Sequence, residues 1–166
     1  MSTFMLAPLA GKSVWLGGLG VTFKLSSEDT GGSISIVEHP IAPGILVPPH
    51  THTREDEISY VLEGEIGARI GDEVMRAIPG CYIVKPRNVK HTFWNAGLMP
   101  ARFIEIISPA GFEKFFTEVA DLFQGGGQPD FEKLATVASG YGITIEMDWV
   151  PELTAKYHLK LLGQAA

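Results

Sequence analysis

Two histidines, His50 and His52, lie two residues apart in the sequence GILVPPHTHTREDEISYVLEG, which runs from Gly44 to Gly64. The preceding Pro48-Pro49 pair restricts the backbone and keeps this segment extended. Side chains at alternate positions of an extended strand point to the same face, so the two imidazoles converge. Glu57 opens the next strand-like run, and its carboxylate can face both imidazoles if the two strands pair.

A third histidine, His91, opens a short apolar run further along the chain, in the sequence GCYIVKPRNVKHTFWN. Three neutral imidazoles and one carboxylate form a divalent transition-metal site of mixed nitrogen and oxygen character. We therefore predict a site for iron, manganese, nickel, cobalt or zinc whose ligands are His50, His52, Glu57 and His91. His39 and His158 show no such spacing, and we expect them to be ordinary core or surface residues.

This spacing resembles the two sequence motifs of the cupin superfamily. The first motif is matched throughout, at Gly44, His50, His52, Glu57 and Gly64. The second motif is matched at Gly80, Pro86, His91 and Asn95. It departs at Asn88, where the family prefers glycine, but asparagine is among the few other residues that tolerate a left-handed backbone.

The resemblance covers roughly residues 14 to 109 and implies an all-β cupin jelly-roll barrel, or double-stranded β-helix, similar to the quercetinase-like single-domain cupins. Glu55 and Asp56 are acidic rivals for the carboxylate ligand, but the six-residue gap before Gly64 favours Glu57. The resemblance also implies a homodimer, with the N-terminal arm and an exposed sheet edge as its contacts. It says less about the reaction, because one fold hosts many chemistries.

Composition narrows the class of partners. The 166 residues carry 13 basic and 19 acidic side chains, for a net charge of −6, and no basic cluster is present. Nucleic acid is therefore an unsuitable partner. The single cysteine, Cys81, favours a reduced, cytoplasmic setting, and we expect it to be a small buried hydrophobe. The sequence has no export signal and no apolar run long enough for a membrane span, so no membrane association is expected.

The chain divides into three parts: an N-terminal arm over residues 1–12, a β-barrel over 13–109 and a C-terminal helical extension over 110–166, packed on the barrel. Short strands separated by turns predict a two-sheet antiparallel barrel. They are expected at residues 13–16, 21–25, 33–41, 57–62, 66–70, 73–78, 81–85, 90–95 and 101–108, with a polar loop at 26–32. Phenylalanines at three- and four-residue steps then predict a helix over 112–123.

Three further elements are expected in the extension. After a loop at 125–129, Asp130 is suited to cap a helix that ends near Ala138. Residues 140–147 are expected to form a strand or an extended tail. Residues 154–162 are expected to form a third helix or a frayed end.

The alternation of side chains along the strands also predicts which residues line a cavity beside the metal. Ser59 and Val61 share the face of Glu57, and Phe93 and Asn95 share the face of His91. Phe112 follows the last barrel strand and is placed to overhang the mouth. We predict these five residues as substrate-lining.

A divalent ion held by three neutral imidazoles and one carboxylate carries a net charge near +1 and attracts anionic oxygen atoms. An octahedral ion keeps two open positions, whereas zinc prefers four ligands and would close the site. The resemblance favours a dioxygenase acting on a small aromatic or enolic, flavonol-like substrate, with Glu57 also serving as proton acceptor. Two alternatives stay open: a lyase or isomerase acting on a small carbonyl compound, and a cupin that binds a small molecule without turnover.

Overall fold

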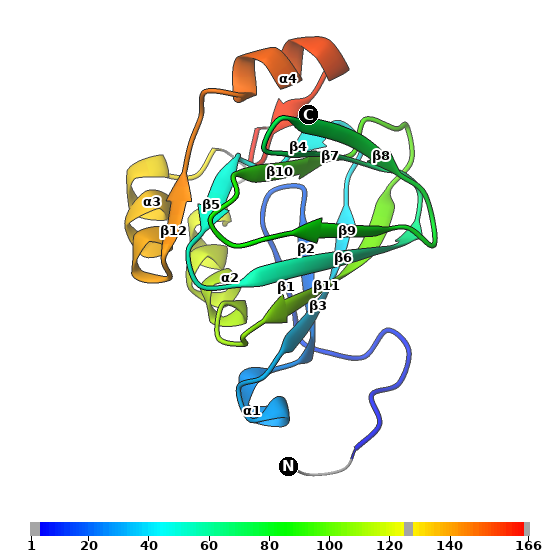
Figure 1. Ribbon diagram of the computed structural model, residues 1–166, viewed down its shortest axis with the longest axis vertical. Coiled ribbons are helices and arrows are strands. Elements are labelled where there is room, and N and C mark those ends of the chain that lie inside the picture. Colours follow the sequence, from blue (N-terminus) through cyan, green and yellow to red (C-terminus); the bar gives the residue numbers. More distant parts are fainter. Residues whose placement is uncertain (1–3, 125–127, 165–166) are drawn as a thin grey trace.

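The computed structural model describes residues 4–124 and 128–164, which form two β-sheets with helices added by the C-terminal part (Figure 1). The predicted all-β architecture is confirmed. In the first sheet the strands follow the order β1 (Ser13–Trp15), β2 (Gly20–Leu25), β3 (Ser35–Ile41), β11 (Ala101–Ser108), β6 (Asp56–Glu63) and β9 (Tyr82–Lys85).

The second sheet carries most of the predicted ligands. Its main path is β12 (Ile143–Ile145), β5 (His50–His52), β10 (His91–Trp94), β4 (Ile45–Leu46) and β13 (Lys160–Leu161). β7 (Ile66–Ile70) also pairs with β10, and β8 (Glu73–Ala77) pairs with β7. The strands are short because proline and glycine turns interrupt the chain at close intervals.

The core lies between the two sheets. Along β3 and β11 burial alternates strictly, so every second side chain faces inward. Val37, Phe103 and Val61 come from three adjacent strands of the first sheet and are fully buried. This two-residue period leaves one face of the sheet to the core, and it also places several polar side chains there.

The helical part begins as predicted. α2 (Glu113–Val119) runs into the 3₁₀ helix η1 (Ala120–Phe123), and α2 packs beside α3 (Phe131–Gly140) next to β12 (Figure 1). Asp130 caps α3 by accepting hydrogen bonds from the backbone N–H groups of Glu132 and Lys133, as predicted. Part of the loop expected at 125–129 lies outside the described residues.

Two segments differ from expectation. The predicted polar loop over 26–32 contains a short helix, α1 (Ser27–Thr30). The third helix of the extension, α4, spans Val150–Tyr157, because His158 takes a left-handed backbone (φ 55°) that ends it. β13 then follows and pairs in parallel with β4.

The region predicted as a helical extension therefore also completes the second sheet. β12 pairs with β5, the strand that carries His50 and His52, and β13 pairs with β4 at the other side. No helix in the described ranges is long and apolar enough to span a membrane.

The N-terminal arm, from residue 4 to 12, forms no strand or helix and is largely exposed. It is tied to β2 by the Lys24 ammonium, which donates to the Ala10 carbonyl at 2.8 Å, and by a backbone bond from Phe23 to Lys12 at 2.9 Å. The homodimer implied by the family resemblance stays a prediction.

A second apolar cluster joins α4 to the barrel. Trp94 lies at its centre with Leu46, Leu153 and Leu161, and its ring stacks on Tyr157 at a centroid distance of 4.9 Å. Gly67 makes room for the indole, because a Cβ there would lie 2.2 Å from it.

We expect Trp94→Ala to lower the free energy of unfolding by about 3–5 kcal/mol, because it empties a buried site between β10 and α4. Val84→Ala on the edge strand β9 is the control: Val84 is 56% exposed, and the change should stay within about 0.5 kcal/mol. Urea unfolding followed by fluorescence and circular dichroism measures both. Equal losses in the two variants would contradict this account of the C-terminal contact.

Candidate metal centre

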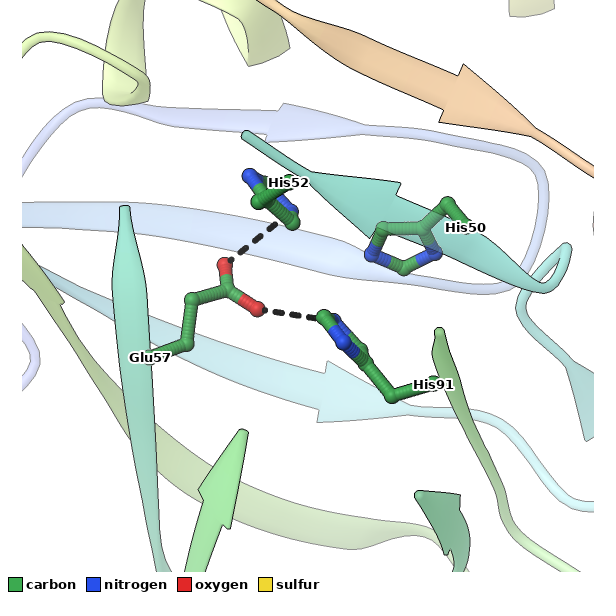
Figure 2. Close-up of side chains that lie close together, drawn as sticks. All are labelled: His50, His52, Glu57 and His91. Atoms are coloured by element: carbon green, nitrogen blue, oxygen red, sulfur yellow. Dashed lines mark ion pairs between the residues drawn. The ribbon is translucent and has the colours of Figure 1, made fainter. Parts of the chain in front are cut away.

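Four predicted ligands meet between the two sheets (Figure 2). His50 and His52 come from β5, His91 from β10 and Glu57 from β6, and their ligand atoms all lie within 4.8 Å of one another. β5 and β10 pair so that His50 lies opposite His91, with ring centroids 4.5 Å apart. Glu57 faces them from the other sheet.

Each imidazole is held in place by a hydrogen bond at Nδ1. Nδ1 of His50 lies 2.7 Å from the Pro48 carbonyl, and Nδ1 of His91 lies 3.0 Å from the Val89 carbonyl. A carbonyl only accepts hydrogen bonds, so these Nδ1 atoms carry the proton and leave Nε2 with a free lone pair.

His52 is oriented in the same way by a carboxylate. Its Nδ1 lies 3.2 Å from Oε2 of Glu55. Glu55 is therefore a partner of a ligand and not the rival ligand that the sequence allowed. A carboxylate behind a ligating histidine fixes the ring and raises its basicity.

The Nε2 atoms of the ligand histidines are suited to bind a cation. Nε2 of His52 and Nε2 of His91 are buried and have no hydrogen-bond partner among the described residues. They lie 3.7 Å and 3.3 Å from the two carboxylate oxygens of Glu57. Lone pairs of neutral imidazoles facing carboxylate oxygens repel unless a proton or a cation lies between them, so the donor set suits a divalent transition metal.

The protonation states follow from burial and neighbouring charge. Burial favours a neutral Glu57, but the ammonium of Lys85 together with His52 and His91 outweighs it and lowers the pKa of Glu57 well below its usual range. Burial lowers the pKa of His50 well below 6.5 and also lowers the pKa of His91. Burial opposes protonation of His52 too, but Glu57 and Glu55 prevail and raise its pKa.

Next to the ligands lies a buried charge network that the sequence reasoning missed. The Lys85 ammonium lies 3.2 Å from Oε2 of Glu57 and forms a short ion pair with Glu105. The hydroxyl of Ser59 donates to both oxygens of Glu105, at 3.0 and 3.2 Å. Lys85 lies opposite Glu57 in the pairing of β6 with β9. Strand alternation places Lys85 on the same buried face as Ile83, which was a signal for its burial but not for its pairing with Glu57.

A mostly apolar cavity adjoins the cluster, with a volume of about 670 Å³ when the space at its mouth is included. His50 and Glu57 lie in its wall, and the predicted residues Phe93 and Phe112 lie there as well. The remaining wall comes mainly from apolar side chains of the connection between β1 and β2, of the segment before β5 and of the C-terminal part: Leu16, Leu19, Val47, Phe115, Phe116, Val119, Phe123, Leu134, Ile143, Ile145 and Leu162.

Three predicted lining residues lie outside this wall. Ser59 is bonded to Glu105, Val61 is packed in the core, and Asn95 bonds three backbone groups around the turn that follows β10. Alternation placed them on the inner face, as expected, but it could not tell packed positions from open ones. His39, expected to be an ordinary residue, is buried, donates to the Gly20 carbonyl at 2.9 Å and lies in the cavity wall.

The loop before His91 behaves as predicted. Asn88 has a φ of 62°, so asparagine takes the left-handed conformation that glycine takes in the family motif. Its N–H donates to the His52 carbonyl at 2.7 Å and ties the loop to β5.

Two facing sheets enclose a three-histidine, one-glutamate cluster that could hold a metal ion, and comparisons with known proteins identify the type of β-barrel. Residues 38–107 match the model of the cupin domain family. The chain is 38% identical over 74 residues to germin-like protein subfamily 2 member 2 of Arabidopsis thaliana, covering 42% of this chain and 34% of that protein. It is 32% identical over 86 residues to the tetracenomycin polyketide synthase protein TcmJ of Streptomyces glaucescens, covering 51% of this chain and 58% of TcmJ.

A solved RmlC-like cupin from Shewanella frigidimarina superposes with a TM-score of 0.58 at 20% identity, covering 68% of this chain and 96% of that one. The chain thus spans one third to three fifths of the two curated relatives. Residues 38–107 thus match the cupin domain family, and the protein shares the jelly-roll fold of the solved cupin.

Replacing a ligand tests the cluster directly. We expect His50→Ala and His91→Ala each to lower bound metal by at least about tenfold after purification and reloading, because each removes one nitrogen donor. His158→Asn is the control: it changes an exposed histidine at the end of α4 and keeps a residue that tolerates the left-handed backbone. Metal content by mass spectrometry decides, and near wild-type retention in both alanine variants would refute the assignment.

Metal affinity should depend on pH. The pKa of His52 is raised and those of His50 and His91 are lowered, so His52 is the imidazole whose proton the metal must displace near neutral pH. Affinity is then full above the pKa of His52 and falls by about tenfold per pH unit below it, with the decline starting above pH 6.5. Calorimetric titration with Co²⁺ between pH 8 and pH 5 measures this slope, and a flat profile would count against histidine ligation.

Proposed function

We propose that the protein is a metal-dependent enzyme that acts on a small aromatic or enolic compound, with dioxygenase-type oxidation as the leading reaction. The observation that supports this most is the position of the cluster: His50 and Glu57 lie in the wall of a cavity that is otherwise mainly aliphatic and aromatic. A site of this kind suits a flat apolar ligand with one anionic oxygen.

The cavity wall explains how such a ligand would be oriented. Phe112, at the start of α2, sets its ring edge-on to His52 at a centroid distance of 4.6 Å and packs against Phe115 and Phe116. Phe93 lies in the wall contributed by β10. Aromatic side chains on two sides favour a planar ring between them, with its oxygen directed toward the ligand cluster.

The charge of the site favours an ionised substrate. When bound, a divalent transition metal would supply a redox-active Lewis acid that His50, His52, Glu57 and His91 would hold with a net charge near +1. The lowered pKa of Glu57 suits it to remain an ionised ligand and weakens its predicted role as proton acceptor. The apolar wall excludes water and strengthens the attraction between the cationic site and a phenolate or enolate oxygen.

A second reaction class has its own support. TcmJ, the relative at 32% identity, is named as a polyketide synthase protein. Polyketides are rich in enolisable carbonyl groups, which the same cationic site could bind as enolates. A lyase, isomerase or ring-forming reaction without oxygen consumption is therefore the second candidate.

Oxygen consumption separates these candidates. Protein reconstituted with iron, manganese, nickel or cobalt is mixed with flavonols and other phenolic enols, and dioxygen uptake is followed with an electrode while products are identified by mass spectrometry. We expect dioxygen uptake that depends on substrate, falls at least about a hundredfold in His91→Ala and persists in His158→Asn.

Two other outcomes would contradict the dioxygenase reaction. Conversion of substrate under argon, with no dioxygen uptake in air, would favour the lyase or isomerase reaction. Stoichiometric binding with no conversion under either condition would contradict catalysis and leave a small-molecule-binding cupin.

A further inference from the structure

Lys85 is the most deeply buried cation among the described residues, with a side chain that is 1% exposed, and it lies beside a predicted metal ligand. Its ammonium lies between two carboxylates, Glu57 and Glu105, and 5.0 Å from the centre of the Phe93 ring. The three charged groups come from neighbouring strands, β9, β6 and β11, of the first sheet.

Stability alone does not account for this network. Removing charges from water costs several kcal/mol per ion, and a buried ion pair is often no more stabilising than apolar side chains of the same volume. The same inner face carries Val37, Ile83 and Ile107, so the core accommodates aliphatic residues there without difficulty. A buried Lys85 next to Glu57 therefore points to a role in the site.

The two oxygens of Glu57 are in different surroundings. Oε2 lies 3.2 Å from the Lys85 ammonium and 3.3 Å from Nε2 of His91. Oε1 has only Nε2 of His52 nearby in the cluster, at 3.7 Å. Lys85 thus holds one oxygen and leaves the other free.

We propose that Lys85 is a positioning residue that binds Oε2 of Glu57, so that the carboxylate offers a metal ion a single oxygen and leaves one more coordination position open to substrate. Glu105 and Ser59 support this role of Lys85. Glu105 neutralises the ammonium, and the Ser59 hydroxyl holds Glu105 in place. A carboxylate can bind a cation through one or both oxygens, and the neighbouring ammonium selects the first mode. This inference rests on the metal centre described above.

If Lys85 has this role, Co²⁺ affinity should fall in one variant and recover in a second. In Glu105→Gln the ammonium keeps its charge but has only Glu57 as an ionic partner, so it competes more strongly with a metal for that carboxylate. We expect Co²⁺ affinity to fall by about tenfold or more. In Lys85→Met/Glu105→Gln both buried charges are gone, and affinity should return at least to the wild-type value.

Azide binding reports separately on the open coordination position of the metal. Azide is a small anion that binds to open positions of Co²⁺ and changes its visible absorption. In Lys85→Met/Glu105→Gln the released Oε2 would occupy the position that azide needs. We expect azide to bind the Co²⁺-loaded double variant about tenfold more weakly than the wild type, and we expect the absorption spectrum before azide addition to change as well.

The control is Glu38→Gln, which makes the same substitution on the outer face of the same sheet, where Glu38 pairs with Arg102. Its Co²⁺ and azide affinities should match the wild type. A merely structural role for Lys85 would lower Co²⁺ affinity in both site variants and leave the spectrum and azide affinity of the loaded protein unchanged, and that result would overturn the proposal.

Different results would contradict the role of Lys85, the metal centre or the proposed reaction. If the double variant does not fold, Glu105→Gln decides alone, and a Co²⁺ affinity equal to that of Glu38→Gln overturns the role of Lys85. Failure of the wild type to bind Co²⁺ overturns both the metal centre and this role. Normal Co²⁺ binding and the expected reversal between the variants, without turnover of any substrate, would support the role of Lys85 and contradict only the proposed reaction.

Discussion

The pairing of β5 with β10 is the constraint on which the site depends. It sets His50 opposite His91, and the two-residue period of β5 brings His52 to the same face. A shift by one residue would turn these imidazoles away from Glu57, because each strand alternates its faces. A backbone bond supports this register: the N–H of Asn88, in the loop before β10, donates to the His52 carbonyl.

The C-terminal part contributes to the same constraint from outside. β12 pairs with β5 on the side away from β10, so the strand bearing His50 and His52 is held between two partners. The side chains of Ile143 and Ile145 line the cavity, as do Phe112, just before α2, and Phe116 of α2. One segment therefore supports the ligand strand and forms the apolar wall, so folding of the C-terminal part and formation of the cavity are coupled.

Sequence patterns were sufficient to predict the barrel and the meeting of the four candidate ligands, because both depend on short-range rules. Alternation gives the faces of strands, and fixed spacing within motifs gives His50, His52, Glu57 and His91. The left-handed conformation of Asn88 followed from its place in the family motif, where glycine is preferred, and from the tolerance of asparagine for that conformation. Long-range pairings were less accessible: nothing local tells that β13 would pair with β4, or that Lys85 and Glu105 would lie on either side of Glu57. Residues such as Val61 and Asn95 show the same limit, since a shared face does not distinguish a packed side chain from one in a cavity wall.

The site brings together polar and charged groups, each of which would be energetically unfavourable if it were buried alone. Two imidazole lone pairs face a carboxylate, and a lysine and a second carboxylate are buried beside it. A cation at the shared centre would turn the contacts between lone pairs and carboxylate into attractions, and Lys85 with Glu105 adds no net charge when both are ionised. Binding of a metal ion should therefore stabilise the fold as well as complete the site. The aliphatic and aromatic part of the cavity wall has no such need for a ligand.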